Sequence, residues 1–561
     1  MSEQEAKKLF DSGIKNFNNK NYFLAEKDFE KALELSPKRL SILDNLASIY
    51  FINSKFEKSL ELLDELLRLN VKEKKIIDLK YKNLAILGKT KELKEFIDNY
   101  LINDSESNKY KIIKNLAYPN FFEDQKTIDQ LRNDLEKSLD DLKNKKEIKL
   151  NLDKELIDPP IFNLSYDQYE NIKLNIKIVD LFRKIYPELN QSFLHSKKNK
   201  KIKIGFFSEF FYNHTISKLF KGIIFNLDRA KFDIFVFHSE KTKKDSWHDE
   251  FLFSEINIKI KNITLPKNLN DKIDLINQQN LDIVFYPDIG MSTEFYFLSF
   301  IRFAKIQITS WGHPITTGNS SIDYFLSSKL IEKDGSQKYY SEKLILTNSL
   351  PMFFYEPKIS KNLSDNDLVK KNLYFCSQSL IKIHPHFDII LKKILQKDKK
   401  AKIFFIKDKN QILYKKLSNR LKKNLKSDFK NINFLEPMSN DEYINFCGKA
   451  SVLLDTLYFG AGNSFHESMI YGTPTVSLPS NSLKSRIVLG AYKQMKITNP
   501  PIVNNIDDYV DKAVDLANLD ENNMLELKRY YAENAKKYLF ENKSFLKEFE
   551  NILLNIFQTN Q

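Results

Sequence analysis

A loop with two glycines between two short apolar segments constrains the fold of this chain more than any other feature. The apolar run 452–454 predicts a buried strand, and a second short strand is predicted over 475–478. Between them lie Gly460, Gly462 and a helix that starts near Asn463. Glycines let a backbone approach a ligand closely, and the unpaired N–H groups at a helix start attract anions. The order strand, loop, helix, strand therefore predicts an α/β unit that can hold a phosphate group.

Two residues of this segment have a second interpretation. Ser464 and Glu467 fit the Ser-x-x-Glu capping box, in which both side chains serve only to close a helix end. Glycine-rich loops also join strands to helices in proteins that bind no phosphate. The segment alone leaves both interpretations open.

Length and composition indicate a multidomain protein of a reducing compartment. The 561 residues are enough for two to four domains. Two cysteines, Cys376 and Cys447, cannot form a disulfide framework. The N-terminus is polar and acidic, unlike a signal peptide, and no apolar run approaches the ~18 residues that a membrane helix needs. We therefore expect a cytoplasmic protein with no membrane partner.

The net charge of +14 raises the question of a nucleic-acid partner. The lysines are spread along the chain and mixed with 74 acidic residues. A nucleic-acid-binding face would cluster its charge on one element. We expect no nucleic-acid partner, since a basic surface can equally attract an anionic sugar nucleotide.

The first hundred residues have the spacing of helical repeats. Three positions recur after 34 residues, which is the tetratricopeptide period, so that Gly13, Phe29 and Ala32 correspond to Ala47, Leu63 and Leu66. A third helix pair, at about 74–103, keeps the helical period but loses the signature. A plain helical hairpin is the alternative, and a repeat stack would offer a concave face to a partner.

Short apolar strands alternate with helices from residue 202 onward. One series begins at Ile202 and a second near Leu373. Such alternation predicts parallel sheets with helices on both faces, and ligands gather at the carboxyl ends of the strands. The predicted domains are tetratricopeptide-like repeats over 1–104, a helical linker region over 105–199, an N-terminal lobe over 200–355, and a C-terminal lobe over 356–561 that ends in a helix packed across the lobes.

Three motifs carry a family resemblance. They are Trp-Gly-His-Pro-Ile-Thr-Thr-Gly at 311–318, Gln-Ser-Leu-Ile-Lys-Ile-His-Pro at 378–385, and the loop segment 454–467. In this order they resemble the O-linked N-acetylglucosamine transferase family, glycosyltransferase family 41, and most closely its bacterial members with tetratricopeptide repeats. The resemblance covers roughly residues 200–540.

This resemblance implies a GT-B fold, in which two Rossmann-like lobes hold the donor mostly on the C-terminal lobe. It also implies an inverting, metal-independent transfer that needs no cofactor. The donor would be a UDP-sugar, typically UDP-N-acetylglucosamine, and the acceptor a Ser or Thr hydroxyl of a protein. The helical repeats would then contact the protein or peptide acceptor.

The resemblance assigns the donor site to the C-terminal lobe and one motif of the N-terminal lobe. Lys382 matches the family lysine that contacts the diphosphate, and its ammonium is a mobile point charge suited to phosphate oxygens. Glu467 matches the acid that binds the ribose, where the animal enzymes have Asp. The donor residues that we expect are Thr316, Thr317, Gln378, Lys382, Gly460, Ala461, Gly462, Asn463, Ser464 and Glu467.

The catalytic candidates are His214, Asp288, His313 and Lys382. His214 matches a histidine once proposed as the general base, and a near-neutral pKa suits a group that removes a hydroxyl proton. Its alternative role is to orient the acceptor. Asp288 ends an apolar strand, a frequent position of site residues, and His313 should line the cleft near the sugar. An ordinary turn capped by hydroxyls is the alternative for the His313 motif.

Two rival functions remain open from the sequence. A repeat-bearing adaptor could keep a transferase fold without activity. A transferase could also act on a lipid-linked or small glycan acceptor in place of a protein.

Overall fold

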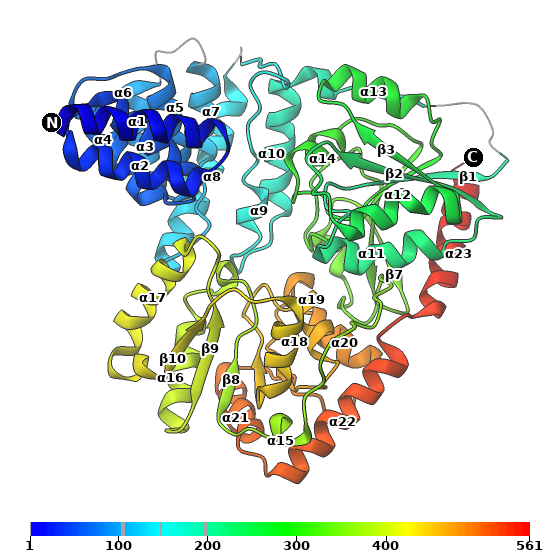
Figure 1. Ribbon diagram of the computed structural model, residues 1–561. Coiled ribbons are helices and arrows are strands. Elements are labelled where there is room, and N and C mark those ends of the chain that lie inside the picture. The colour runs from blue at the N-terminus through cyan, green and yellow to red at the C-terminus, as the bar shows by residue number, and fades with distance from the viewer. Residues whose placement is uncertain (1, 102–106, 146–147, 195–199, 561) are drawn as a thin grey trace. The chain divides into compact units, whose positions relative to one another are not determined.

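The computed structural model describes residues 2–101, 107–145, 148–194 and 200–560. These residues form two compact units (Figure 1): residues 1–121 with 409–412, and residues 122–408 with 413–561. The predicted boundary at 104/105 lies outside the described residues. The predicted boundary at 199/200 lies where the described residues begin again, at residue 200.

The first unit is helical. Its helices are α1 (Ser2–Asn18), α2 (Tyr22–Leu35), α3 (Leu40–Ile52), α4 (Phe56–Arg68), α5 (Lys74–Ile86), α6 (Thr90–Tyr100) and α7 (Ser107–Leu116). The positions that the 34-residue period predicts are buried in it. Gly13 must be small because a Cβ there would lie 2.6 Å from the ring of Phe29. Close packing of α1 against α2 thus explains the first small residue of the repeat.

The turns inside the helix pairs show that the third pair follows the same period. Lys20, Ser54 and Gly88 lie 34 residues apart and have left-handed φ angles of 61°, 59° and 60°. Tyr81 stands where Gly13 and Ala47 stand in the first two pairs. The α5–α6 pair therefore keeps the repeat's backbone turn and has lost its small packing residue.

The second unit contains two sheets whose paired strands are all parallel. The N lobe has the strand order β3-β2-β1-β4-β5-β6-β7. Its strands are β1 (Ile202–Phe207), β2 (Phe232–Ser239), β3 (Ile260–Leu265), β4 (Ile283–Tyr286), β5 (Ile306–Ser310), β6 (Tyr324–Ser328) and β7 (Lys343–Thr347). The helices of this lobe are α11 (Thr215–Asn226), α12 (Ser246–Ile258), α13 (Leu269–Asn277) and α14 (Thr293–Leu298).

The C lobe has the strand order β10-β9-β8-β11-β12. Its strands are β8 (Leu373–Phe375), β9 (Lys402–Ile406), β10 (Ile432–Leu435), β11 (Val452–Leu454) and β12 (Thr475–Val476). The helices are α15 (Asp365–Leu368), α16 (Phe387–Lys397), α17 (Ile412–Leu425), α18 (Asn440–Lys449), α19 (Asn463–Ser468), α20 (Ile487–Gln494) and α21 (Ile506–Ala517). The chain then continues into α22 (Glu521–Tyr538) and α23 (Lys543–Thr559). Short 3₁₀ turns include η3 (Leu380–Lys382) and η4 (Lys426–Asn431).

The ends of this unit join its lobes. The segment before β1 contains α8 (Gln125–Asn144), α9 (Ile161–Leu164) and α10 (Ile172–Ile185). At the other end, α22 follows the C lobe and α23 returns to the N lobe, as Figure 1 shows. The ring centroids of Phe549 in α23 and Phe285 in β4 lie 5.7 Å apart within one buried apolar cluster. Among the described helices, none is long and apolar enough to cross a membrane.

Candidate functional site

The side chain of Lys382 connects the two main donor motifs of the C lobe. Its Nζ donates to Gln378 Oε1 at 3.1 Å and to the carbonyl of Gly460 at 3.0 Å, and it lies 4.7 Å from the ring centroid of Phe459. Gln378 Nε2 in turn donates to Ser464 Oγ at 2.6 Å. Four predicted donor residues therefore form one hydrogen-bonded cluster beyond the carboxyl ends of β8 and β11.

The Lys382 ammonium contacts only neutral oxygens in this cluster. Burial lowers its pKa to about 8, and the nearby Asp455 carboxylate opposes that shift. No carboxylate of the described residues lies within ion-pair distance of it. The cluster is thus a partly buried positive charge without a direct counter-charge.

The buried carboxylate of Asp455 holds the glycine loop in place through hydrogen bonds. Asp455 accepts a hydrogen bond from the Ala461 amide at 2.6 Å and another from Ser477 Oγ at 2.5 Å. Position 460 must be glycine because a Cβ there would lie 2.9 Å from Asp455 Oδ2. The Gly460 amide donates to the carbonyl of Lys484 at 2.8 Å. Two of the loop amides that we expected to bind phosphate, those of Gly460 and Ala461, are therefore already used inside the protein.

The capping-box interpretation of Ser464 and Glu467 is wrong. Helix α19 has Gly462 as its N-cap, and no side chain caps it. Ser464 binds Gln378, and the buried Glu467 accepts a hydrogen bond from Lys218 of α11 in the N lobe. Glu467 thus forms an ion pair between the lobes, at the position where the family resemblance places the ribose. The Oδ1 atom of Asn463 is buried and has no hydrogen-bond partner among the described residues.

Asp288 follows β4, as predicted, and is almost fully buried. Its Oδ2 accepts a hydrogen bond from Ser208 Oγ at 3.0 Å. Burial raises the pKa of this carboxyl to about 8, so the group exchanges a proton near neutral pH. That property is the one a general base or acid needs.

His214 has a local structural role. It is the N-cap of α11, where its Nδ1 accepts a hydrogen bond from the Ile216 amide at 3.3 Å. Its ring stacks on Phe210 with centroids 4.5 Å apart, and burial lowers its pKa to about 4. Because Nδ1 is an acceptor, the neutral ring carries its proton on Nε2 and offers no free lone pair. This geometry favours an orienting role over the role of base.

The motif at 311–318 is mostly engaged within the N lobe. Thr316 Oγ1 donates to the buried carboxylate of Glu342 at 2.7 Å, and the hydroxyl of Thr317 donates to the same carboxylate. The protons of these two hydroxyls are therefore used within the lobe, and the donor contacts that we expected of Thr316 and Thr317 stay a prediction. His313 differs, because its Nε2 is buried without a partner among the described residues, and burial lowers its pKa to about 3.

The segment 158–171, here called the strap, packs against both lobes beside these residues. The ring of Phe162 lies 5.8 Å from that of His313, and the ring of Tyr166 lies 4.8 Å from that of Phe459. Lys484 is buried and its ammonium donates to the strap carbonyls of Ser165, Asp167 and Tyr169 at 2.7 to 3.1 Å. Lys484 thus links the strap to the glycine loop, because its side chain binds the strap and its carbonyl accepts a hydrogen bond from the Gly460 amide.

Sequence reasoning missed three residues of this site: Lys218, Asp455 and Lys484. Lys218 lies four residues after His214 and so on the same face of α11, which is a signal the sequence contained. Asp455 directly follows the apolar run of β11, the same kind of position that singled out Asp288. Lys484 has no motif around it, and only its contacts with the strap reveal its role.

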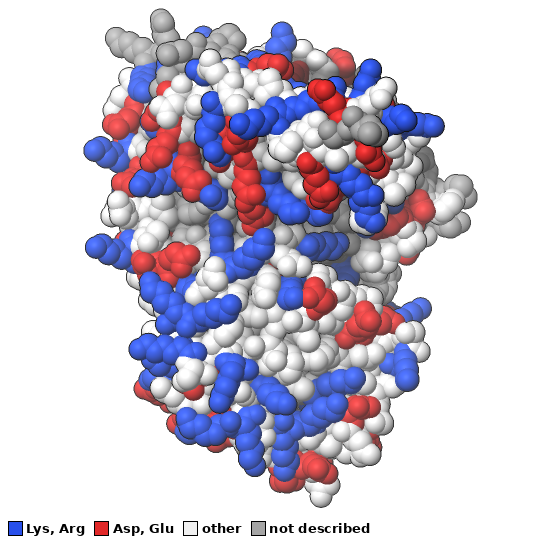
Figure 2. All heavy atoms as spheres, turned by 60° about the vertical axis from the view of Figure 1, so that its left-hand side comes forward, with Lys and Arg blue, Asp and Glu red and all other residues white. Residues whose placement is uncertain are grey.

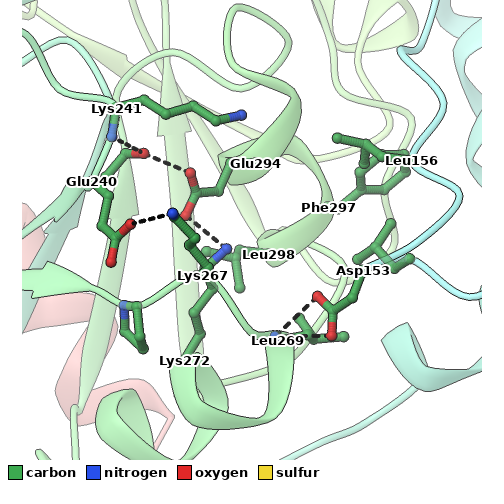
Figure 3. Close-up of a pocket in the computed structure, with 13 residues that line it drawn as sticks. Asp153, Leu156, Glu240, Lys241, Lys267, Leu269, Lys272, Glu294, Phe297 and Leu298 are labelled. Atoms are coloured by element: carbon green, nitrogen blue, oxygen red, sulfur yellow. Dashed lines mark hydrogen bonds and ion pairs between the residues drawn. The ribbon is translucent and has the colours of Figure 1, made fainter. Parts of the chain in front are cut away.

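A separate hollow of about 240 Å³ lies in the N lobe beside β2 and β3 (Figure 3). Its carboxylates are engaged within the protein. Glu294 accepts a hydrogen bond from Ser239 at 2.6 Å and binds Lys272 at 2.9 Å, and Asp153 accepts from the Leu269 amide at 3.1 Å. The ammonium of Lys241 at this hollow forms no ion pair with a described residue, but it is exposed to solvent, unlike the partly buried ammonium of Lys382. Across the described part of the chain, no group of three or more His, Cys, Asp or Glu side chains is placed to hold a metal ion.

Two parallel-sheet lobes of this kind define a protein with the GT-B fold. The solved structure of a mutant Thermobaculum terrenum O-GlcNAc transferase shares this fold, with a TM-score of 0.70 and 16% identity over 100% of this chain and 98% of that chain. Residues 173–358 match the model of glycosyl transferase family 41. The GT-B fold and the resemblance to family 41 are therefore confirmed.

Two curated relatives are similar over about half of the chain. The UDP-glucose:protein N-beta-glucosyltransferase of Actinobacillus pleuropneumoniae serotype 5b (strain L20) is 27% identical over 279 residues, which are 48% of this chain and 44% of the relative. The probable UDP-N-acetylglucosamine–peptide N-acetylglucosaminyltransferase SEC of Arabidopsis thaliana is 22% identical over 331 residues, 57% of this chain and 33% of the relative. The chain thus matches less than half the length of either relative.

Proposed function

We propose that this protein is a glycosyltransferase that moves a sugar from a UDP-sugar to a protein acceptor. Lys382 would neutralise the diphosphate of the UDP leaving group, and Glu467 would accept hydrogen bonds from the ribose. The transfer would invert the sugar and need no metal or cofactor, as the family resemblance implies. Asp288 would act as the acid or base near the acceptor.

One observation carries this proposal: the Lys382 ammonium is held by neutral oxygens only. A partly buried charge without a counter-charge is unfavourable, and its lowered pKa reports that penalty. An anionic ligand would supply the missing charge. Gln378, Ser464 and the unpaired Asn463 Oδ1 surround it with polar groups that can bind the rest of such a ligand.

The names of the relatives support the class of reaction, but they do not agree on which sugar is transferred. Their names pair a UDP-sugar with a protein or peptide, but one names glucose and the other N-acetylglucosamine. We propose N-acetylglucosamine and a Ser or Thr hydroxyl, following the family resemblance, with the helical repeats as the surface that contacts the acceptor.

A UDP titration followed by a donor panel tests this proposal. We expect UDP to bind at sub-millimolar concentration, and UDP-N-acetylglucosamine to be hydrolysed or transferred faster than UDP-glucose and UDP-galactose. Intact-mass analysis of candidate acceptor proteins would show the added sugar. No UDP binding at millimolar concentration would instead support the inactive adaptor, and transfer only to a free or lipid-linked glycan would support the non-protein acceptor.

A further inference from the structure

One segment of the C lobe carries most of the net charge of the protein. Residues 392–430 contain fourteen lysines, one arginine and three aspartates, a net charge of +12 in a chain of +14. The other lysines are spread along the chain as expected, but in this segment too few acids accompany the lysines to balance their charge. The segment comprises the second half of α16, all of β9 and α17, and most of η4.

The helices of this segment share one face of the C-lobe sheet. Strands β8, β9 and β10 follow one another toward the same edge, so right-handed crossovers place α16 and α17 on the same side. Arg420 and Asn424 of α17 both donate to Asp388 of α16, at 2.9 Å and 2.7 Å. In Figure 2, lysine and arginine predominate over the lower part of the view, which is the C lobe.

Apart from Lys409, which belongs to the first compact unit, eight lysines of the segment are exposed and form no ion pair with any described residue. We call them the basic face: Lys392, Lys399, Lys400, Lys402, Lys422, Lys423, Lys426 and Lys430. Other lysines nearby are already matched, since Lys393 binds Asp507 and Lys397 binds Asp511. The basic face is thus what remains after the local acids have been paired, and its like charges repel one another until an anion approaches.

The basic face lies away from the candidate donor site. Lys399 and Lys400 precede β9 and Lys402 begins it, while Lys426 and Lys430 lie in η4 just before β10. These lysines therefore gather at the amino ends of the strands, whereas the Lys382 cluster follows the carboxyl ends of β8 and β11. Binding of a UDP-sugar does not account for this charge, and a partner on the basic face leaves the donor site uncovered.

We propose, contrary to the expectation of no membrane partner, that the basic face docks the protein onto the surface of an anionic lipid bilayer. Lysines near such a surface attract acidic headgroups additively, without any specific pocket. Their long aliphatic stems also let the ammonium reach headgroups while the helices lie along the surface.

The composition of the face disfavours nucleic acid. Readers of bases rely on arginine, and single-strand binders rely on exposed aromatic rings. The single arginine of the segment, Arg420, is buried, and none of its four aromatic side chains is fully exposed: Phe404, Phe405, Tyr414 and Phe429.

Vesicle sedimentation of the full chain tests this docking. Phosphatidylcholine vesicles with about 30% phosphatidylglycerol should bind the protein, and pure phosphatidylcholine vesicles should not. Binding should disappear at about 0.5 M salt, where the screening length is a few ångströms. The triple variant Lys399→Gln, Lys400→Gln, Lys402→Gln should lose about a hundredfold in partition coefficient.

A matched control separates the basic face from the overall charge. The triple variant Lys241→Gln, Lys243→Gln, Lys244→Gln removes the same charge from exposed positions of the N lobe and should stay within about threefold of wild type. Equal losses in both triple variants would overturn the proposal, as would absence of wild-type binding to acidic vesicles. Oligonucleotide binding that depends on the basic face, without vesicle binding, would replace the lipid surface with nucleic acid. Because the readout needs no catalysis, failure of the proposed transferase function would leave this test intact.

Discussion

The two lobes use their polar site residues differently. In the C lobe, Lys382, Gln378 and Ser464 bind one another and the glycine loop, and the ammonium remains without a carboxylate partner. In the N lobe, the hydroxyls of Thr316 and Thr317 donate hydrogen bonds to Glu342, and His214 caps a helix. The C lobe therefore holds an unmatched charge that a ligand can complete, whereas much of the N-lobe motif stabilises its own fold.

Two N-lobe groups depart from this contrast. Asp288 is a buried carboxyl with a single hydroxyl partner, and His313 has an unpartnered ring nitrogen. If the contrast is correct, substitutions at Lys382 and Asp288 should affect function most, and substitutions at His214 least.

Lys382→Ala should have the largest effect. Removing the charge that faces the leaving diphosphate should lower turnover by at least about a hundredfold and weaken UDP binding. Steady-state kinetics and UDP titration measure both. The exposed Lys343→Ala is the control for loss of one lysine, and unchanged turnover in Lys382→Ala would remove the donor-site assignment.

Asp288→Asn should lower turnover by about a hundredfold while UDP affinity stays unchanged. The amide has almost the same shape as the protonated carboxyl but cannot exchange the proton. Kinetics with the preferred donor, together with UDP titration, separate the two effects. A normal rate would show that the buried carboxyl only supports the fold through Ser208.

UDP affinity should fall by about tenfold between pH 7 and pH 9. The free protein loses the Lys382 proton around its pKa of about 8, and bound diphosphate favours the ammonium and raises that pKa. The affinity is therefore fully present below pH 8 and is lost as the pH rises above it. Calorimetry at both pH values measures this change, and a flat profile in Lys382→Ala would assign it to this residue. An equal slope in that variant would point to another group.

Lys484→Met should weaken UDP binding by about fivefold, because the freed strap no longer supports Phe459 and the glycine loop. Hydrogen exchange over residues 161–171 should rise in the same variant. Lys528 offers a matched control, since its buried ammonium also donates to three carbonyls, those of Leu368, Gly448 and Ala450. Lys528→Met should destabilise the fold comparably and leave the UDP affinity of the folded protein intact. Equal UDP losses in both variants would mean that the strap contributes only stability.

His214→Ala should change turnover the least, by no more than about threefold. Loss of the helix cap should lower the free energy of unfolding by about 1 kcal/mol. Kinetics and thermal unfolding together check this expectation. If His214→Ala instead lowered turnover about a hundredfold and left UDP affinity unchanged, His214 would be the general base.

Much of the fold could be predicted because it depends on local patterns. The alternation of short apolar runs with helices predicts two parallel-sheet lobes, and the 34-residue period predicts helical repeats with small residues such as Gly13 where two helices approach. The family resemblance also placed Gln378, Lys382 and the glycine loop in one site. The apolar alternation and the repeat period are patterns of short chain segments, and such patterns indicate the secondary structure directly.

The partners of the same side chains could not be predicted. Nothing near Glu467 in the chain indicates that Lys218, 249 residues earlier, binds it. The same holds for Lys484, whose carbonyl partners lie more than 300 residues away. The amino-acid sequence by itself determines which helices and strands form and which residues can carry charge. Which charges become paired, and which one remains unmatched at Lys382, depends on distances between remote segments, because hydrogen bonds and close ion pairs form only when the two groups are in contact.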